Sequence, residues 1–463
     1  MVALTRKELG SKLIFFQLFY VMFYNLLCDY LGAPRSISFV IDAVNIVVFA
    51  WLLFYEKALT EIIRLRLQYV LFAALLLLAA SWLTAILNAV PFLLVLWSTR
   101  NSMRFFPFFF SVIIFWNNKS AGFFSKTMFY LQIPNSLFSA FQFFVLNKRG
   151  DHLGGLFGTA TGCNAYLYVF LLFVVTLVVQ EYLHGKKSFL VMCATCFVSM
   201  IIAAMAELKV VFIVVPLVII ASFVLNKTTM RTFLLAVVIS IALIVSVNLI
   251  IIFFPAWADS FSSIAALIDV GKDTGGGYDI PRLGAFSKLN ELFFRNSIVR
   301  NIIGLGFGSC EYSSYDFLTT DFYLRYGILH YRWFTHMMTF LQTGYLGITC
   351  YALFILAAFS WITKMKKRYG DPNGIGSFGQ ITCGLVIINF AYNSSLTTES
   401  GYVLTAVLAL PFVYYKGYIF AERRKQIKNV RTFPEELPEA VPEAVPEAIP
   451  EILPNTVEPE FFM

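Results

Sequence analysis

The chain has 463 residues, of which 59% are hydrophobic and 13% are charged, and its mean hydropathy is +0.74. Because a soluble domain carries about 25% charged residues, this composition excludes a soluble globular protein and makes the lipid bilayer the solvent for most of the chain. The net charge of +8 is what loops facing anionic lipid give, so we expect no nucleic-acid partner.

The hydrophobic segments predict an all-α polytopic integral membrane protein. Twelve segments are long enough to cross the roughly 30 Å hydrocarbon core of a bilayer as helices. The predicted spans lie near residues 13–32, 36–55, 68–90, 92–116, 127–146, 162–182, 188–205, 210–225, 233–254, 333–361, 378–396 and 401–418.

Lysine and arginine predict how these spans are oriented. With the N-terminus in the cytoplasm, most of the 35 basic residues fall in cytoplasmic connections, as the positive-inside rule requires. An even number of spans then returns the chain to the same side. We therefore expect both termini to be cytoplasmic.

The longest polar interval, residues 255–332, is predicted to form one large external loop before the last three spans. Five arginines and two histidines lie in it or directly after it, namely Arg282, Arg295, Arg300, Arg325, Arg332, His330 and His336. So many basic residues between two apolar spans suggest an external site for an anionic substrate. Within the loop, the apolar spacing of residues 287–303 predicts an amphipathic helix lying on the external surface.

Residues 432–463 differ in composition from the predicted membrane domain, residues 1–431. A Pro-Glu-Ala-aliphatic tetrad repeats there, and a proline at every fourth position prevents a helix. We expect a disordered acidic cytoplasmic tail that acts as a solvated spacer, with binding of a partner as the alternative.

Basic residues in or beside the spans need a physical reason, because a charge within a span costs about 2.5–3.5 kcal/mol on insertion scales. Arg100 and Arg104 are four residues apart and therefore share one face of a helix. They either reach the outer headgroups or form a paired guanidinium site for phosphate. Lys209, expected at the outer surface, either pairs with Glu207 or contacts the substrate.

Two glycine-rich segments are candidates for phosphate binding. The first follows Arg149 and ends near Asn164, and its backbone N–H groups could approach a phosphate, although such a loop alone is a weak signal. The second, GLGFG at residues 304–308, lacks the preceding strand and following helix of a nucleotide fingerprint, so we reject that interpretation.

His336 opens the tenth predicted span, four residues after Arg332. It is either an interfacial residue or a general base, since an unperturbed pKa of about 6.5 suits proton transfer near neutrality. The sequence has no HExxH or other metal-ligand spacing, and we expect neither a metal nor another cofactor. Arginines would then neutralise the leaving group.

These motifs, in this order, resemble the O-antigen polymerase and O-antigen ligase family, the Wzy-type enzymes of bacterial surface polysaccharide assembly. The similar pieces are Arg149 with the glycines after it and Asn164, Lys209 after the seventh span, Arg282 early in the long loop, GLGFG, and His336 followed by Gln342 and two glycines. The resemblance covers roughly residues 70–415 and implies a GT-C-like fold. The family often has an acidic residue where this chain has Gln342, so that position departs from the pattern.

The resemblance implies a polymerase of the bacterial inner membrane. It would join undecaprenyl-pyrophosphate-linked oligosaccharide repeat units into an O-antigen, capsule or exopolysaccharide by metal-independent, inverting glycosyl transfer. The catalytic candidates are then His336, Arg282 and Arg149, and the substrate-binding candidates are Arg100, Arg104, Lys209, Asn164, Arg295, Arg300 and Arg332. A chain-length regulator and a flippase are the implied protein partners. The alternatives are an O-antigen ligase-type glycan transferase and a flippase for the same lipid-linked sugars.

Overall fold

The structure is a computed structural model. It describes residues 6–55, 57–227, 229–235 and 279–431, with single positions at 237, 241, 248 and 252. The chain divides into two compact units, Met1–Ile419 and Phe420–Met463. Most of the ninth predicted span, the first part of the predicted external loop (255–278) and the predicted tail (432–463) lie outside the described residues.

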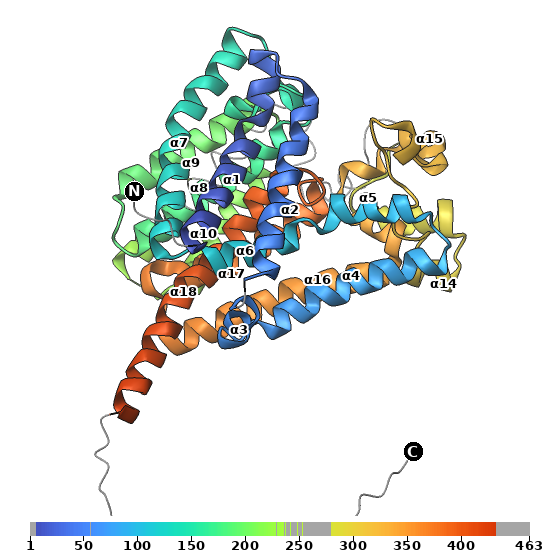
Figure 1. Ribbon diagram of the computed structural model, residues 1–463. Helices are drawn as coiled ribbons and strands as arrows, with labels where there is room; N and C mark the ends of the chain where they lie inside the picture. The colour runs from blue at the N-terminus through green and yellow to red at the C-terminus, as the bar shows by residue number, and fades with distance from the viewer. Residues whose placement is uncertain are drawn as a thin grey trace, which may run out of the picture. The chain divides into compact units, whose positions relative to one another are not determined.

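Within the described ranges the regular structure is entirely helical (Figure 1). The helices of the first part of the chain are α1 (Arg6–Leu31), α2 (Phe39–Leu53), α3 (Ala58–Arg64), α4 (Gln68–Leu87), α5 (Phe92–Met103), α6 (Phe105–Phe115), α7 (Asn118–Phe144), α8 (Asn164–Leu183), α9 (Phe189–Met205) and α10 (Val211–Leu225). Those of the second part are α13 (Ala285–Leu289), α14 (Ile298–Ile303), α15 (Asp321–Tyr326), α16 (Thr335–Tyr369), α17 (Ile375–Tyr392) and α18 (Ser400–Arg431).

The membrane prediction is confirmed at the level of helix length and composition. Among the described residues, seven helical segments are long and apolar enough to cross a bilayer. They are Lys7–Leu31, Arg35–Leu53, Gln68–Leu87, Asn164–Leu183, Thr335–Tyr369, Pro372–Tyr392 and Ser400–Arg424, and each coincides with a predicted span. The fourth predicted span is divided at Arg104 into α5 and α6, and α9 and α10 are apolar but shorter.

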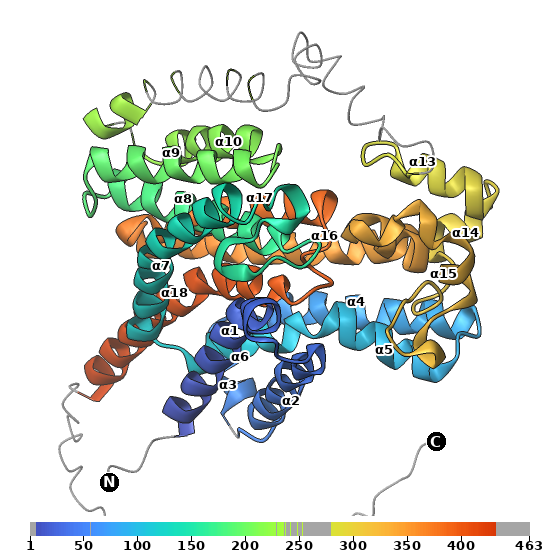
Figure 2. The ribbon, with the colours of Figure 1, turned by 90° about the horizontal axis from the view of Figure 1, so that it is seen from above.

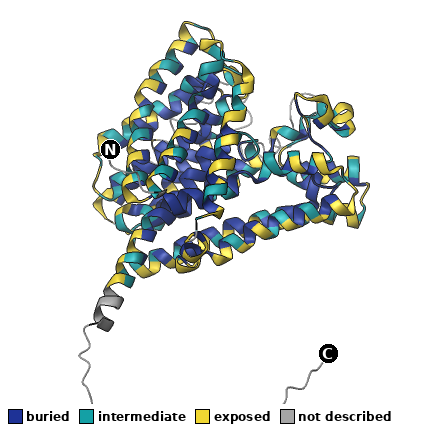
Figure 3. Ribbon diagram, viewed as in Figure 1, coloured by how far each residue is buried: buried dark blue, intermediate teal, exposed yellow. Residues whose placement is uncertain are grey.

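The most deeply buried helices are α6, α8, α17 and the first part of α18. Every residue of α6 except Pro107 is buried, and 83% of the apolar window of α8 is buried, against 22% for the segment that contains α2. Figure 3 shows this contrast between the inner helices and the outer ones. The exposed side chains of the outer helices are large and apolar, as expected for helices that face lipid.

A glycine break in α16 positions the start of that helix. Gly344 has φ +59° and ψ −155°, a conformation essentially restricted to glycine. The break removes the helical donors for the carbonyls of Leu341 and Gln342, and the backbone N–H groups of Leu305 and Gly306 donate to them instead, at 2.9 Å each. The GLGFG segment is therefore used inside the protein to complete a broken helix.

After the break, α16 continues for about 37 Å at 1.5 Å per residue, enough to cross a bilayer. This part packs along α4, which lies side by side with it in Figures 1 and 2 although far from it in sequence. The residues before the break, 335–343, form a separate short helix. That short helix carries His336.

The described part of the predicted external loop has a hydrophobic core of its own. Ile280, Leu289, Phe294, Cys310 and Tyr331 are buried in it together with the start of α16. In Figures 1 and 2 the short helices of this loop lie at the end of the first unit where α4 turns into α5.

The amphipathic helix predicted over residues 287–303 is not continuous. It is divided between α13, a π-helical turn and α14, because Arg295 and Asn296 adopt left-handed conformations (φ +49° and +60°). The division turns Leu289 and Phe294 into the core of the loop, while Val299 stays 62% exposed. One shared apolar face for this segment was therefore a wrong expectation.

Candidate functional site

The first glycine-rich loop does not present free amides to a phosphate. The N–H groups of Thr159 and Ala160 donate to the carboxylate of Asp29, at 2.6 and 2.9 Å. The N–H of Gly155 donates to Gln142 Oε1 at 2.7 Å. The loop thus has backbone N–H groups arranged to bind an anion. These N–H groups already donate to a carboxylate and a side-chain amide of this chain.

Arg100 and Arg104 lie in a buried charge network, defined here as Asp42, Arg100, Arg104 and Glu399. Both guanidinium groups bind the carboxylate of Asp42 from α2, and Arg104 also binds Glu399 at 3.2 Å. The side chain of Arg104 is only 4% exposed. The network contains two cations and two anions, so its formal charge is zero.

The network gives the two arginines carboxylate partners that neither interpretation of the pair included. Arg104 does not extend to headgroups, because its guanidinium lies between the rings of Phe105 and Tyr402, 5.1 and 5.4 Å from their centroids. Nor is the pair an open phosphate site, because the carboxylates of Asp42 and Glu399 occupy it. Burial alone would raise the pKa of Glu399, but Arg104, a backbone hydrogen bond and Arg100 together hold that pKa below its usual range.

Hydrogen bonds extend this network to the start of α16. Arg100 donates to Asn101 at 2.8 Å, and Asn101 donates to the buried carboxylate of Glu311 at 3.0 Å. Glu311 also accepts from Ser98 at 2.7 Å and from Gln342 at 3.1 Å. The structure thus places a carboxylate from another segment, Glu311, in contact with the Gln342 side chain.

A second group of polar side chains lies where α16 begins. It consists of Lys209, Arg282, His336 and Tyr392, and we call it the mouth cluster. His336 Nε2 donates to the backbone carbonyl of Arg282 at 3.2 Å. The guanidinium of Arg282 lies on the rings of Phe334 and Tyr392, 4.7 and 4.8 Å from their centroids. Arg282 itself is exposed. Its charge is therefore held in place by aromatic faces and remains accessible.

Lys209 joins this cluster from the turn between α9 and α10. Burial lowers the pKa of Lys209, the carboxylate of Glu207 opposes that shift, and the charge of Arg282 lowers the pKa further. Tyr392 interacts with the backbone of Val210, next to Lys209. Three sequence candidates that are distant in the chain thus meet at one place.

The remaining candidates lie around the mouth cluster rather than in it. The Arg149 guanidinium lies on the ring of Phe143 at 5.3 Å, although a Cβ added to the next residue, Gly150, would lie 3.3 Å from the Glu207 carboxylate. Asn164 donates to Asp151 at 2.8 Å.

In the predicted external loop, Arg300 donates to the carbonyl of Phe293 at 3.2 Å, and Arg295 is exposed. Arg332 lies over the rings of Tyr312 and Tyr323, at 5.2 and 5.6 Å. None of these three arginines contacts Arg282 within the described part of the chain.

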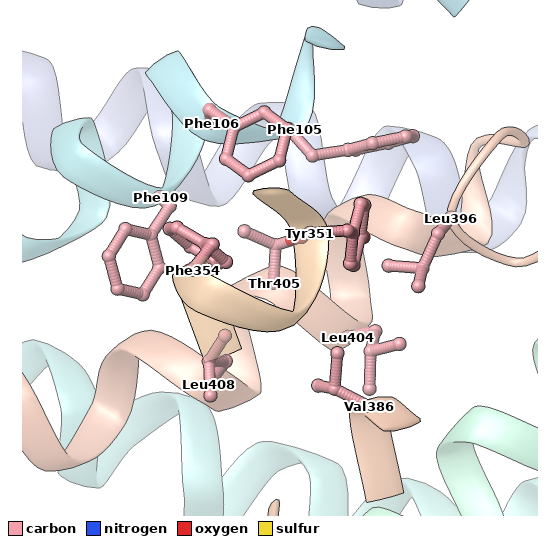
Figure 4. Close-up of a pocket in the computed structure, with 10 residues that line it drawn as sticks. All are labelled: Phe105, Phe106, Phe109, Tyr351, Phe354, Val386, Leu396, Leu404, Thr405 and Leu408. Carbon is pink, nitrogen blue, oxygen red and sulfur yellow. The ribbon is translucent and has the colours of Figure 1, made fainter. Parts of the chain in front are cut away.

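An apolar pocket lies next to the buried charge network (Figure 4). Its cavity volume is about 20 Å³, and it is lined by aromatic and aliphatic side chains of α6, α16, α17, α18 and the loop before α18, with Phe105 shared between the pocket and the network. Thr405 and Tyr351 supply its only hydroxyl groups. A cavity of this size has room for about one water-sized group, and its lining offers no general base.

Several functional candidates were missed from the sequence. Asp42 is a lone carboxylate within an apolar segment, and such intramembrane charges are a signal in themselves. Glu311 gave no signal, because the loop that carries it is polar in any case.

Comparisons with known protein families and with curated proteins give no match for this sequence. Among the described residues, no group of three or more His, Cys, Asp or Glu side chains could hold a metal ion.

Proposed function

We propose that this protein is a membrane glycosyltransferase that joins undecaprenyl-pyrophosphate-linked oligosaccharide repeat units into a surface polysaccharide. The observation that carries the proposal is the mouth cluster. Lys209, Arg282 and His336 meet where α16 begins, and the described ion pairs include no carboxylate bound to Arg282. Such a surplus of positive charge suits a diphosphate.

The proposed chemistry is an inverting transfer without a metal. The donor diphosphate binds Arg282 and Lys209, with Arg149 on the neighbouring loop as the third cation. A hydroxyl of the acceptor sugar attacks the anomeric carbon, and the lipid diphosphate leaves with the electron pair of the broken C–O bond. Its developing charge is stabilised by the cations. The hydroxyl proton passes to a base, for which the sequence predicts His336.

The proposal extends to the membrane topology and location of the protein. We propose twelve spans arranged in a GT-C-like fold, a location in the bacterial inner membrane, and cytoplasmic termini. The basis is the distribution of lysine and arginine and the order of motifs shared with the O-antigen polymerase and ligase family. The lipid-linked glycan would then meet the mouth cluster on the external side.

The test is polymer formation by purified protein supplied with lipid-linked repeat units. Arg282→Ala should abolish the product ladder at near-normal protein abundance. Arg282→Lys should rescue poorly, because an ammonium group cannot reproduce the planar bidentate contact. A chelator should leave the wild-type ladder intact. Strict dependence on a divalent ion, or a normal ladder from Arg282→Ala, would contradict the proposal.

The same assay separates the two alternatives. A ligase-type transferase would bind the same donor but form a single transfer product on a lipid A core or protein acceptor, without a ladder. A flippase would give no covalent product. The neutral buried charge network is the feature that favours a flippase, because paired charges inside membrane proteins also line transport pathways.

A further inference from the structure

A second histidine lies close to the mouth cluster and is held by a carboxylate. His330 Nδ1 is 2.6 Å from Asp279 Oδ1. The two side chains are 39% and 28% exposed, so the pair is neither buried nor fully solvated. A carboxylate bound to one imidazole nitrogen fixes the tautomer, and the other nitrogen, Nε2, is then free to accept a proton.

The backbone holds this pair in a defined position. The next residue after each member, Ile280 and Tyr331, is buried in the core of the external loop. His330 itself has φ +52° and links two short 3₁₀ helices. Its ring stacks on Trp333, with 3.8 Å between ring centroids and 14° between planes. Rotation of the imidazole is therefore restricted from two sides.

The pair is also close to the mouth cluster along two adjacent segments. Asp279 is three residues before Arg282, and His330 is four residues before Phe334, whose ring lies under the Arg282 guanidinium. The segments 279–282 and 330–336 thus contact each other at both ends, at Asp279–His330 and at Arg282–His336.

His336 is less suited to accept a proton from a substrate. The residue is 6% exposed, Nε2 is bound to the carbonyl of Arg282, and Nδ1 is buried. By contrast, among the described residues His330 Nε2 has no partner, and its side chain is accessible. A general base must reach the proton that it abstracts.

We propose that His330, positioned by Asp279, is the catalytic base of the proposed transfer and that His336 is a positioning residue for Arg282. The inference rests on the proposed function. The O–H bond of the acceptor hydroxyl breaks as its proton passes to His330 Nε2, and the new C–O bond forms at the anomeric carbon. The diphosphate departs onto the cations of the mouth cluster. Asp279 stabilises the imidazolium that results.

The experiment measures ladder formation by the full-length protein in nanodiscs supplied with lipid-linked repeat units. His330→Ala should lower the turnover rate by about 10²–10⁴-fold, and added imidazole should restore part of it. Asp279→Asn should lower kcat with little change in KM for the donor. His336→Ala should instead raise KM for the donor, because His336 acts by positioning Arg282. Added imidazole should not restore the activity of this variant.

His330→Gln, which keeps a polar side chain of similar size, guards against a folding defect, and the melting temperature of each variant is measured alongside. A normal ladder from both His330 variants would overturn the inference while leaving the proposed function in place. Imidazole rescue of His336→Ala in place of His330→Ala would also overturn it. A wild-type protein that builds no ladder would refute the proposed function and this inference together.

Discussion

The buried charge network and the mouth cluster are both built around arginine, but they differ in what neutralises the charge. Arg100 and Arg104 meet the carboxylates of Asp42 and Glu399 inside the helix bundle. Arg282 lies instead on the aromatic faces of Phe334 and Tyr392 and is exposed. An aromatic face orients a cation without cancelling its charge, whereas a carboxylate cancels it.

Basic residues in a membrane protein therefore identify an anion site only when their partners are known. By sequence alone, Arg100 and Arg104 appear as strong a phosphate pair as any in the chain. In the structure they stabilise the contact between α2, the α5–α6 junction and the loop before α18. We therefore propose that the network serves folding and that the mouth cluster serves ligand binding.

The largest effect on stability should come from breaking the buried network. Arg104→Met leaves the carboxylate of Glu399 without its cation. Removing one partner of a fully buried pair costs about 3–5 kcal/mol, which is an upper bound here because the Glu399 side chain is 22% exposed. Thermal unfolding of the purified protein in nanodiscs should show a large fall in melting temperature. The double variant Arg104→Met with Glu399→Gln should be less destabilised than Arg104→Met, since it also removes the charge left unpaired.

The matched control is Arg295→Ala, a change at an exposed arginine of the external loop. Its melting temperature should equal that of the wild type. If Arg104→Met unfolds at the wild-type temperature, the network does not stabilise the bundle and its assignment to folding is wrong.

A smaller loss of stability should follow when the glycine at the break in α16 is replaced. Gly344→Ala forces an alanine into a glycine conformation, which costs about 1–3 kcal/mol, and its Cβ would lie 2.5 Å from the Asn301 carbonyl oxygen. The measurement is again the melting temperature, together with ladder formation, since the short helix with His336 would move. Gly384→Ala is the control, because no atom lies within 4 Å of a Cβ there. Equal stability of the two variants would show that the break is not required.

The smallest effect on stability and activity should come from replacing Arg332. This residue resembles Arg282 in its aromatic contacts but lies outside the mouth cluster. Arg332→Ala removes the interaction with Tyr312 and Tyr323, worth about 0.5–1 kcal/mol. We expect a slight fall in melting temperature and a product ladder close to normal. Loss of the ladder would instead place Arg332 among the groups that bind the diphosphate, as the sequence predicted.

The proposed orientation of the protein in the membrane can be tested by labelling intact cells with a membrane-impermeant maleimide. In a variant without native cysteines, Ser314→Cys in the external loop should be labelled and Lys57→Cys between α2 and α3 should not. Both positions are exposed in the structure, so accessibility within the protein does not bias the comparison. The reverse pattern would invert the proposed orientation.

Sequence reasoning succeeded where a single physical rule decides the outcome. Helices long and apolar enough to cross a bilayer follow from hydropathy, and seven predicted spans coincide with such helices in the described part of the chain. Prediction from the sequence failed where contacts between distant segments determine the local structure. The break at Gly344 and the backbone N–H groups of Leu305 and Gly306 that complete it belong to segments about forty residues apart, which no local pattern connects.

The same reasoning applies to the candidate site. Arg282, Lys209 and His336 were each singled out from the sequence, and the structure brings them together. The Asp279–His330 pair was missed, because a carboxylate and a histidine separated by 51 residues give no sequence signal. Asp42 was within reach of prediction, since a carboxylate in an apolar span rarely lacks a cation.

The most direct test of the account compares binding of undecaprenyl diphosphate to the wild type, Arg282→Ala and Arg295→Ala, measured by native mass spectrometry of the purified protein. We expect Arg282→Ala to lose most of the bound lipid diphosphate with only a slight fall in melting temperature, since it also loses two aromatic contacts, while Arg295→Ala binds like the wild type. Wild-type binding by Arg282→Ala would show that the diphosphate binds elsewhere and would contradict the assignment of the mouth cluster.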